Sequence, residues 1–171
     1  MKLKNILALN LLLSLGVAVG CGSSGNSSNP TPGSASIAGQ ANAKDLTDYG
    51  QCNSGPSANR IAGSWQQTFQ IGEITFVATI DVGSGQTTIT NDCMMAGRTL
   101  RASTSSPSSY TSSQLTVFTN NQDHEEINET DFHMNCDVSI KPMAVSYSFQ
   151  GSCLVMTDPS TSQKMIWLPK R

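Results

Sequence analysis

Potential metal ligands are densest at residues 123–126, which read DHEE, and His133 follows them along the chain. Imidazole nitrogens and carboxylate oxygens both bind zinc. Asparagine and glutamine precede this run, and it holds no apolar residue, a pattern typical of a solvated loop. A metal centre would also require His124 and His133 to face one point, whereas His133 falls on the polar face of its predicted strand. We therefore expect a solvated hairpin tip and no metal.

Residues 80–85, which read IDVGSG, resemble the D-T-G-S loop of aspartic proteases, where two carboxylates share a proton and activate water. Val82 stands in place of the hydroxyl residue of that loop, and a homodimer would have to supply the second carboxylate. The alternative is a hairpin turn built from the aspartate and the glycines. The chain has no G-x-S-x-G motif, and no cysteine has a histidine placed to activate it. The sequence predicts no catalytic residue, no cofactor and no enzymatic activity.

The chain contains five cysteines: Cys21, Cys52, Cys93, Cys136 and Cys153. The last four are too widely spaced for the paired C-x-x-C pattern of zinc sites. An even number in an exported chain predicts two disulfides, with three possible connectivities. Cys136 lies on the apolar face of its predicted strand, and Cys93 shares a face with Ile89. These faces favour a Cys93–Cys136 bridge, which would leave Cys52 to pair with Cys153.

The first twenty residues have the anatomy of a secretion signal. Lys2 and Lys4 precede an apolar stretch over 6–19 that is too short for a membrane-spanning helix. Residues 18–21 (AVGC) resemble the lipobox of bacterial lipoproteins, which implies cleavage before Cys21 and acylation of that cysteine. Acyl chains would then anchor the protein to a membrane without crossing it. Gly22, in place of the Asp that retains enterobacterial lipoproteins in the inner membrane, implies an outer-membrane location.

Composition divides the chain into a signal at 1–20, a lipidated tether with an N-terminal segment at 21–60, and one folded domain at 61–171. Residues 22–36 are almost all Gly, Ser, Asn, Pro and Thr, which is typical of a flexible tether. The full chain has a net charge of −2, and loss of Lys2 and Lys4 with the signal would bring it to −4. Without a basic cluster, nucleic-acid binding is not expected.

Apolar and polar residues alternate with a period of two through most of residues 64–171, which predicts an all-β domain. The expected strands lie at 65–71, 73–82, 86–95, 99–105, 114–119, 126–140, 143–150, 153–157 and 163–168. Residues 104–113 and 120–126 are expected to be loops, and 41–49 a short helix. An antiparallel meander of this kind must close into a barrel, or form a sandwich or half-barrel, to hide its apolar face.

Gly63-Ser64-Trp65 resembles the G-x-W signature of lipocalins and related calycins, and residues 147–167 resemble the last hairpins of bacterial lipocalin-like lipoproteins. The resemblance implies a small β-barrel with Trp65 buried at one end. It also implies that Lys170 or Arg171 packs a cation against that ring.

Two functional hypotheses follow. A tethered barrel could hold a small apolar ligand or dock an envelope partner, or it could be a structural lipoprotein with a filled core. An apolar interior cavity of at least ~300 Å³ would favour the ligand, and a closed interior would favour the structural role.

Overall fold

The computed structural model describes residues 44–159, 162 and 164–171, so the expected signal, tether and lipidated Cys21 lie outside the described residues. The described elements are β1 (Lys44–Asp45), the 3-10 helix η1 (Tyr49–Asn53), β2 (Gly63–Ile71), β3 (Ile74–Val82), β4 (Gln86–Met95), β5 (Arg98–Tyr110), β6 (Gln114–Val117), β7 (Asn121–Asn128), β8 (His133–Ile140), β9 (Met143–Gln150), β10 (Cys153–Thr157) and β11 (Lys164–Pro169). In this part of the chain no helix has the length and apolarity needed to cross a membrane.

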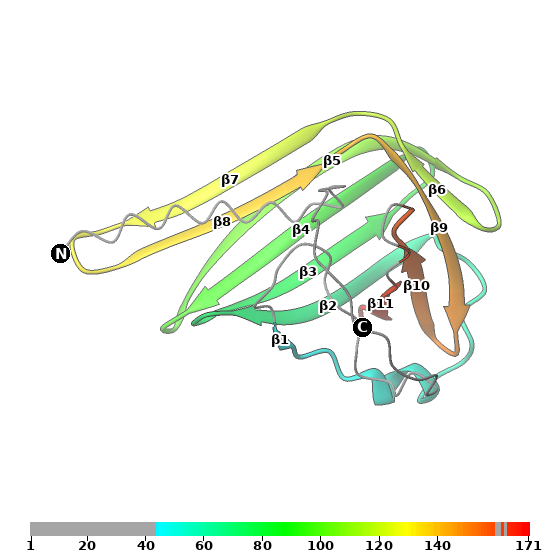
Figure 1. Ribbon diagram of the computed structural model, residues 1–171, viewed down its shortest axis with the longest axis horizontal. Coiled ribbons are helices and arrows are strands. Elements are labelled where there is room, and N and C mark those ends of the chain that lie inside the picture. Colours follow the sequence, from blue (N-terminus) through cyan, green and yellow to red (C-terminus); the bar gives the residue numbers. More distant parts are fainter. Residues whose placement is uncertain (1–43, 160–161, 163) are drawn as a thin grey trace, which may run out of the picture.

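Eight strands close into an antiparallel barrel in the order β2-β11-β10-β9-β6-β5-β4-β3, with β3 pairing back to β2 (Figure 1). β1 adds a short strand to β2, where Lys44 pairs with Gln70. The strands β7 and β8 form a separate hairpin that runs alongside β4 and β5 (Figure 1). The expected all-β meander is therefore confirmed, and it closes into a barrel instead of a sandwich or half-barrel.

The barrel forms because apolar residues recur at every second position of its strands. Phe76, Ala78 and Ile80 of β3 all point into the core, and Phe76 stacks on Phe69 of β2 with ring centroids 5.1 Å apart. The turn between β3 and β4 contains Gly85 at a φ of +97°, a conformation that favours glycine. This turn confirms the hairpin expected at residues 83–85.

The stretch 104–113 differs from its expected loop, because β5 continues to Tyr110. Its hydroxyl side chains pair across the strands: Thr88 with Ser105 at 2.7 Å and Thr87 with Ser108 at 2.8 Å. Such pairs satisfy polar groups within a sheet, so serine and threonine can replace the usual apolar strand residues. Composition alone suggested a loop because it does not show these partners.

The stretch 120–126, also expected to be a loop, lies mostly in β7, and the single strand expected at 126–140 is interrupted by a turn. Glu129 N donates to Phe132 O at 2.9 Å and closes that turn. β7 has no alternating apolar pattern, and it is a strand because its backbone pairs with β8 from Asn121 opposite Ile140 to Asn128 opposite His133. Hairpin pairing therefore overrides its local sequence preference.

The prediction of a helix at 41–49 is wrong for residues 44–49, the part of this stretch that the structure describes. Lys44 and Asp45 form β1, and the 3-10 helix η1 begins only at Tyr49. Backbone pairing with β2 holds this segment extended: Leu46 N donates to Thr68 O at 2.8 Å. The Asp48 side chain caps η1 by accepting from Gly50 N at 3.1 Å.

Candidate functional site

The apolar face of β8 packs into the barrel core beside the inward side chains of the barrel strands. Cys136, Val138 and Ile140 belong to one continuous buried cluster with the inward residues of the barrel strands. The hairpin has room because the wall it covers carries small side chains, Ala102 and Ser106 of β5, both fully buried. The barrel core is thus completed by a hairpin that is not part of its wall.

A small cavity lies inside the described part of the barrel. An interior cavity of about 30 Å³ lies between Ile80, Ile89, Val145 and Met156, at the base of the hairpin near Ile140. This volume holds about one or two water molecules. It falls well below the ~300 Å³ that a small-molecule pocket requires.

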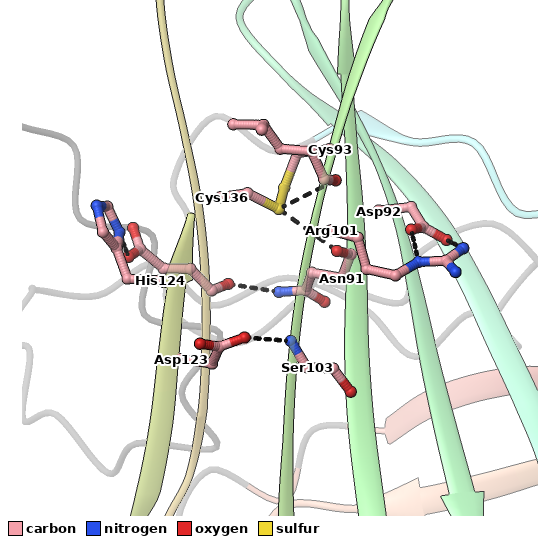
Figure 2. The surroundings of a disulfide bond; sticks show 10 residues. Asn91, Asp92, Cys93, Arg101, Ser103, Asp123, His124 and Cys136 are labelled. Atoms are coloured by element: carbon pink, nitrogen blue, oxygen red, sulfur yellow. Dashed lines mark hydrogen bonds and ion pairs between the residues drawn. A yellow bond between two sulfur atoms is a disulfide. The ribbon is translucent and has the colours of Figure 1, made fainter. Parts of the chain in front are cut away.

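A disulfide fastens the hairpin to the inner face of the barrel. Cys93 of β4 is bonded to Cys136 of β8, and both are fully buried (Figure 2). Beside it, the buried Asn91 donates its Nδ2 to the backbone oxygen of Asp137 at 2.7 Å. At the hairpin tip, Arg98 pairs with Glu129 at 2.7 Å and lies 4.6 Å from the ring centroid of Phe132. The predicted Cys93–Cys136 bridge is therefore confirmed.

Side chains of β7 satisfy the open edge of β5. β6 pairs only with the end of β5, at Ser108–Tyr110, which leaves the earlier residues of β5 without a neighbouring strand on that side. There the Asp123 carboxylate accepts from Ser103 N at 2.7 Å, and Asn121 Nδ2 donates to Ser105 O. These bonds protect an edge that would otherwise be free to pair with another chain. The acidic run at 123–126 thus has a structural role at Asp123.

His124 and His133, the histidines weighed as metal ligands, belong to different strands of this hairpin. His124 Nδ1 bonds the Asp137 carboxylate, and its Nε2 lies 3.7 Å from Glu126. The hydrogen bond to Asp137 raises the pKa of His124 above its usual 6.5, and Glu126 adds to this shift. Among the described residues no group of three His, Cys, Asp or Glu side chains is arranged to hold a metal ion.

Asp81, the residue weighed as a protease carboxylate, lies at the end of β3 opposite Thr88 of β4. Its carboxylate accepts a hydrogen bond from the Ser64 hydroxyl of β2. The structure therefore gives Asp81 a hydrogen-bonding role between two neighbouring strands.

Trp65 is buried at one end of the barrel, as the G-x-W resemblance implied, and is 5% exposed. Its Nε1 donates to Ile61 O at 2.8 Å, and its ring lies 6.1 Å from that of Phe149. The prediction that a cation packs against this ring is wrong. Arg171 lines the same end of the barrel, but its guanidinium donates a hydrogen bond to Ser54 Oγ at 3.4 Å. In the described part of the chain, the cation–π contact lies elsewhere, between Arg98 and Phe132.

The second disulfide fastens the N-terminal segment to this end of the barrel. Cys52 of η1 is bonded to Cys153 of β10, as predicted. Ser152 N donates to Cys52 O at 2.7 Å, and Ala58 N donates to Gly151 O at 2.8 Å. Gly151 has a φ of +57°, and a Cβ there would lie 2.2 Å from Cys52 O, so only glycine fits this close approach.

A hollow of about 380 Å³ lies between this segment and the barrel end. Pro56, Ala58, Arg60, Trp65, Pro169 and Arg171 are among its lining residues. The G-x-W resemblance predicted Trp65 and Arg171 at this end, but no motif in residues 55–60 predicted that they form a wall of the hollow. The one signal for that wall was Cys52, whose bridge to Cys153 brings the segment to the barrel.

No protein-family model, curated protein or solved structure matches the chain.

Proposed function

We propose that this protein is a lipid-anchored envelope lipoprotein whose barrel is a filled, rigid scaffold and carries no ligand in its interior. The observation that supports the interior part of this proposal is the position of β8, whose apolar face belongs to the buried core. The role is non-catalytic and uses no cofactor.

The filled interior argues against the alternative of an apolar ligand inside the barrel. Such a ligand would have to occupy the space of Val138 and Ile140, because the cavity beside Ile140 holds only about 30 Å³. The hairpin would have to move away from β4, and the Cys93–Cys136 bond holds it there. Entry would therefore require both a broken disulfide and the exposure of a large apolar surface to water.

The anchor part of the proposal rests on sequence alone. A short basic region, an apolar stretch and a small-residue run before Cys21 match the features of a lipoprotein signal. Acylation of Cys21 provides membrane attachment, and Gly22 supports the outer membrane as its destination.

Binding of an apolar fluorescent probe tests the interior. The oxidised protein is titrated with two uncharged apolar fluorescent probes, Nile red and, separately, pyrene. We expect no saturable binding to the native barrel. Stoichiometric binding that is lost when Val138 is replaced by a larger residue, V138F, would contradict a filled interior.

Metabolic labelling with palmitate tests the anchor. Wild-type protein is expected to carry label and to fractionate with membranes, and Cys21→Ser to carry none. Label retained on the Cys21→Ser protein would refute this assignment. The Cys52→Ser protein is the matched control and should still be labelled.

A further inference from the structure

Two of the four arginines line the hollow at the Trp65 end of the barrel. The other two each pair with a carboxylate: Arg98 with Glu129 at 2.7 Å, and Arg101 with Asp92 at 2.6 Å. Arg60 and Arg171 have no Asp or Glu carboxylate within ion-pair distance among the described residues, and both line the hollow. Guanidinium groups are planar, permanently charged donors suited to phosphate and carboxylate oxygens.

The rest of the lining combines five apolar residues with two glycines and four small polar residues, Ser57, Asn59, Ser64 and Ser152. Pro56, Ala58 and Ala62 come from the N-terminal segment, and Trp65 and Pro169 from the barrel. A hollow of about 380 Å³ lies within the ~300–1,000 Å³ range of small-molecule sites, which combine an apolar lining with a few polar groups. Its composition therefore suits a molecule with an anionic end and an apolar body.

The walls of the hollow are fixed before any ligand arrives. The Cys52–Cys153 bridge, the hydrogen bond from Ala58 N to Gly151 O and the close approach of Cys52 to Gly151 hold the segment in place. On the other side, Lys170 N donates to Ser64 O at 2.9 Å and holds the last residues against β2. A site formed in advance loses less conformational entropy on binding.

We infer that this hollow binds a phosphate or carboxylate group carried on a small apolar body, with Arg60 and Arg171 on the anion and the apolar lining around the body. The same chemistry is offered by a free small molecule and by an anionic lipid headgroup. The site lies outside the barrel interior, so its test is independent of the one for the filled core.

Calorimetric titration with phenyl phosphate tests the free-ligand source. Residues 22–171 are used, which keep every described residue and both disulfides and lack only the signal and Cys21. We expect saturable binding that weakens with added salt. The variants Arg60→Gln and Arg171→Gln should each bind about tenfold more weakly or worse, as loss of one charge-assisted hydrogen bond implies. Arg101→Gln, a matched exposed arginine away from the hollow, should bind as wild type does.

Sedimentation with vesicles tests the lipid source. Vesicles of phosphatidylglycerol are expected to retain the protein through Arg60 and Arg171 if a headgroup is the ligand, and vesicles of phosphatidylcholine are not. Arginine-dependent binding in either arm supports the site, and the arm that responds identifies the source. Absence of binding in both arms, or equal loss with Arg101→Gln, would overturn the inference. Unchanged melting temperatures of the two glutamine variants exclude a folding defect.

Discussion

The barrel interior and the hollow at its Trp65 end both lie beside a disulfide, yet the interior is filled and the hollow is open. In the interior, Cys93–Cys136 fastens a hairpin whose side chains leave about 30 Å³. At the barrel end, Cys52–Cys153 fastens an irregular segment beside the barrel and leaves about 380 Å³. A β-hairpin presents a row of apolar side chains on one face, whereas residues 55–60 carry small and polar ones.

The comparison shows that a disulfide to a barrel strand can help to fill a space or to form one, depending on the segment that it attaches. β8 supplies an alternating apolar face that fits against small residues of β5. The segment after Cys52 supplies proline, alanine and Arg60, which can line a hollow but cannot fill it. The two disulfides should therefore affect the protein differently when they are removed.

Loss of either disulfide should destabilise the protein, and loss of Cys52–Cys153 should do so more. The bridges span sequence separations of 101 and 43 residues. The chain-entropy relation gives ~4.7 kcal/mol for the longer loop and ~4 kcal/mol for the shorter one. Denaturant unfolding of the C52A/C153A and C93A/C136A proteins measures the difference.

The two double variants should differ more clearly in how much of the apolar core they expose to solvent. Only C93A/C136A should increase binding of anilinonaphthalene sulfonate, because only that bridge holds apolar side chains in the interior. Equal dye binding by both double variants would remove the distinction between the two regions.

Trp65→Ala should lower the free energy of unfolding by about 3–5 kcal/mol, the usual cost of truncating a buried aromatic residue. Trp65 joins the two regions, since it belongs to the core and also lines the hollow. Thermal unfolding measures the loss. Ser112→Ala, in the exposed turn after β5, is the control and should leave stability within about 0.5 kcal/mol of wild type. A small effect of Trp65→Ala would contradict its role as the end of the core.

Asn91→Ala should cost about 1–3 kcal/mol, because it removes a buried hydrogen bond and leaves Asp137 O without that donor. Thr90→Ala, the outward neighbour on the same strand, should cost less. Chemical denaturation compares the two proteins, and an equal cost would show that Asn91 does not hold the hairpin.

The smallest expected effect is the pH dependence of the stability of the β7–β8 hairpin. The pKa of His124 is raised in the folded protein by the hydrogen bond to Asp137, so its contribution to stability is complete below about pH 6.5 and is lost as the pH rises through the folded pKa. Amide protection in β7 and β8 should therefore fall slightly as the pH rises from mildly acidic to mildly alkaline. His124→Ala should abolish this change, and a change that persists in the variant would have another source.

Much of the barrel was predictable because its strands alternate clearly. The faces of Cys93 and Cys136 were read from that alternation, and the bridge followed. β7 and the end of β5 could not be predicted, because their strand structure depends on pairing and on hydroxyl and amide bonds such as that of Asn121 to Ser105. The hollow could not be predicted from the sequence for a similar reason. Arg60 and Arg171 line the same space only because a disulfide holds the N-terminal segment against the barrel.

Hydrogen–deuterium exchange of the β8 amides tests the central claim, that the hairpin is a permanent part of the barrel core. If it is, the amides of β8 that pair with β7 should exchange only through global unfolding, as slowly as those of β3 and β4. Exchange of β8 that is much faster than that of β3 and β4, and insensitive to global stability, would show that the hairpin opens by itself. The interior would then be open to a ligand, which would contradict a filled, rigid scaffold.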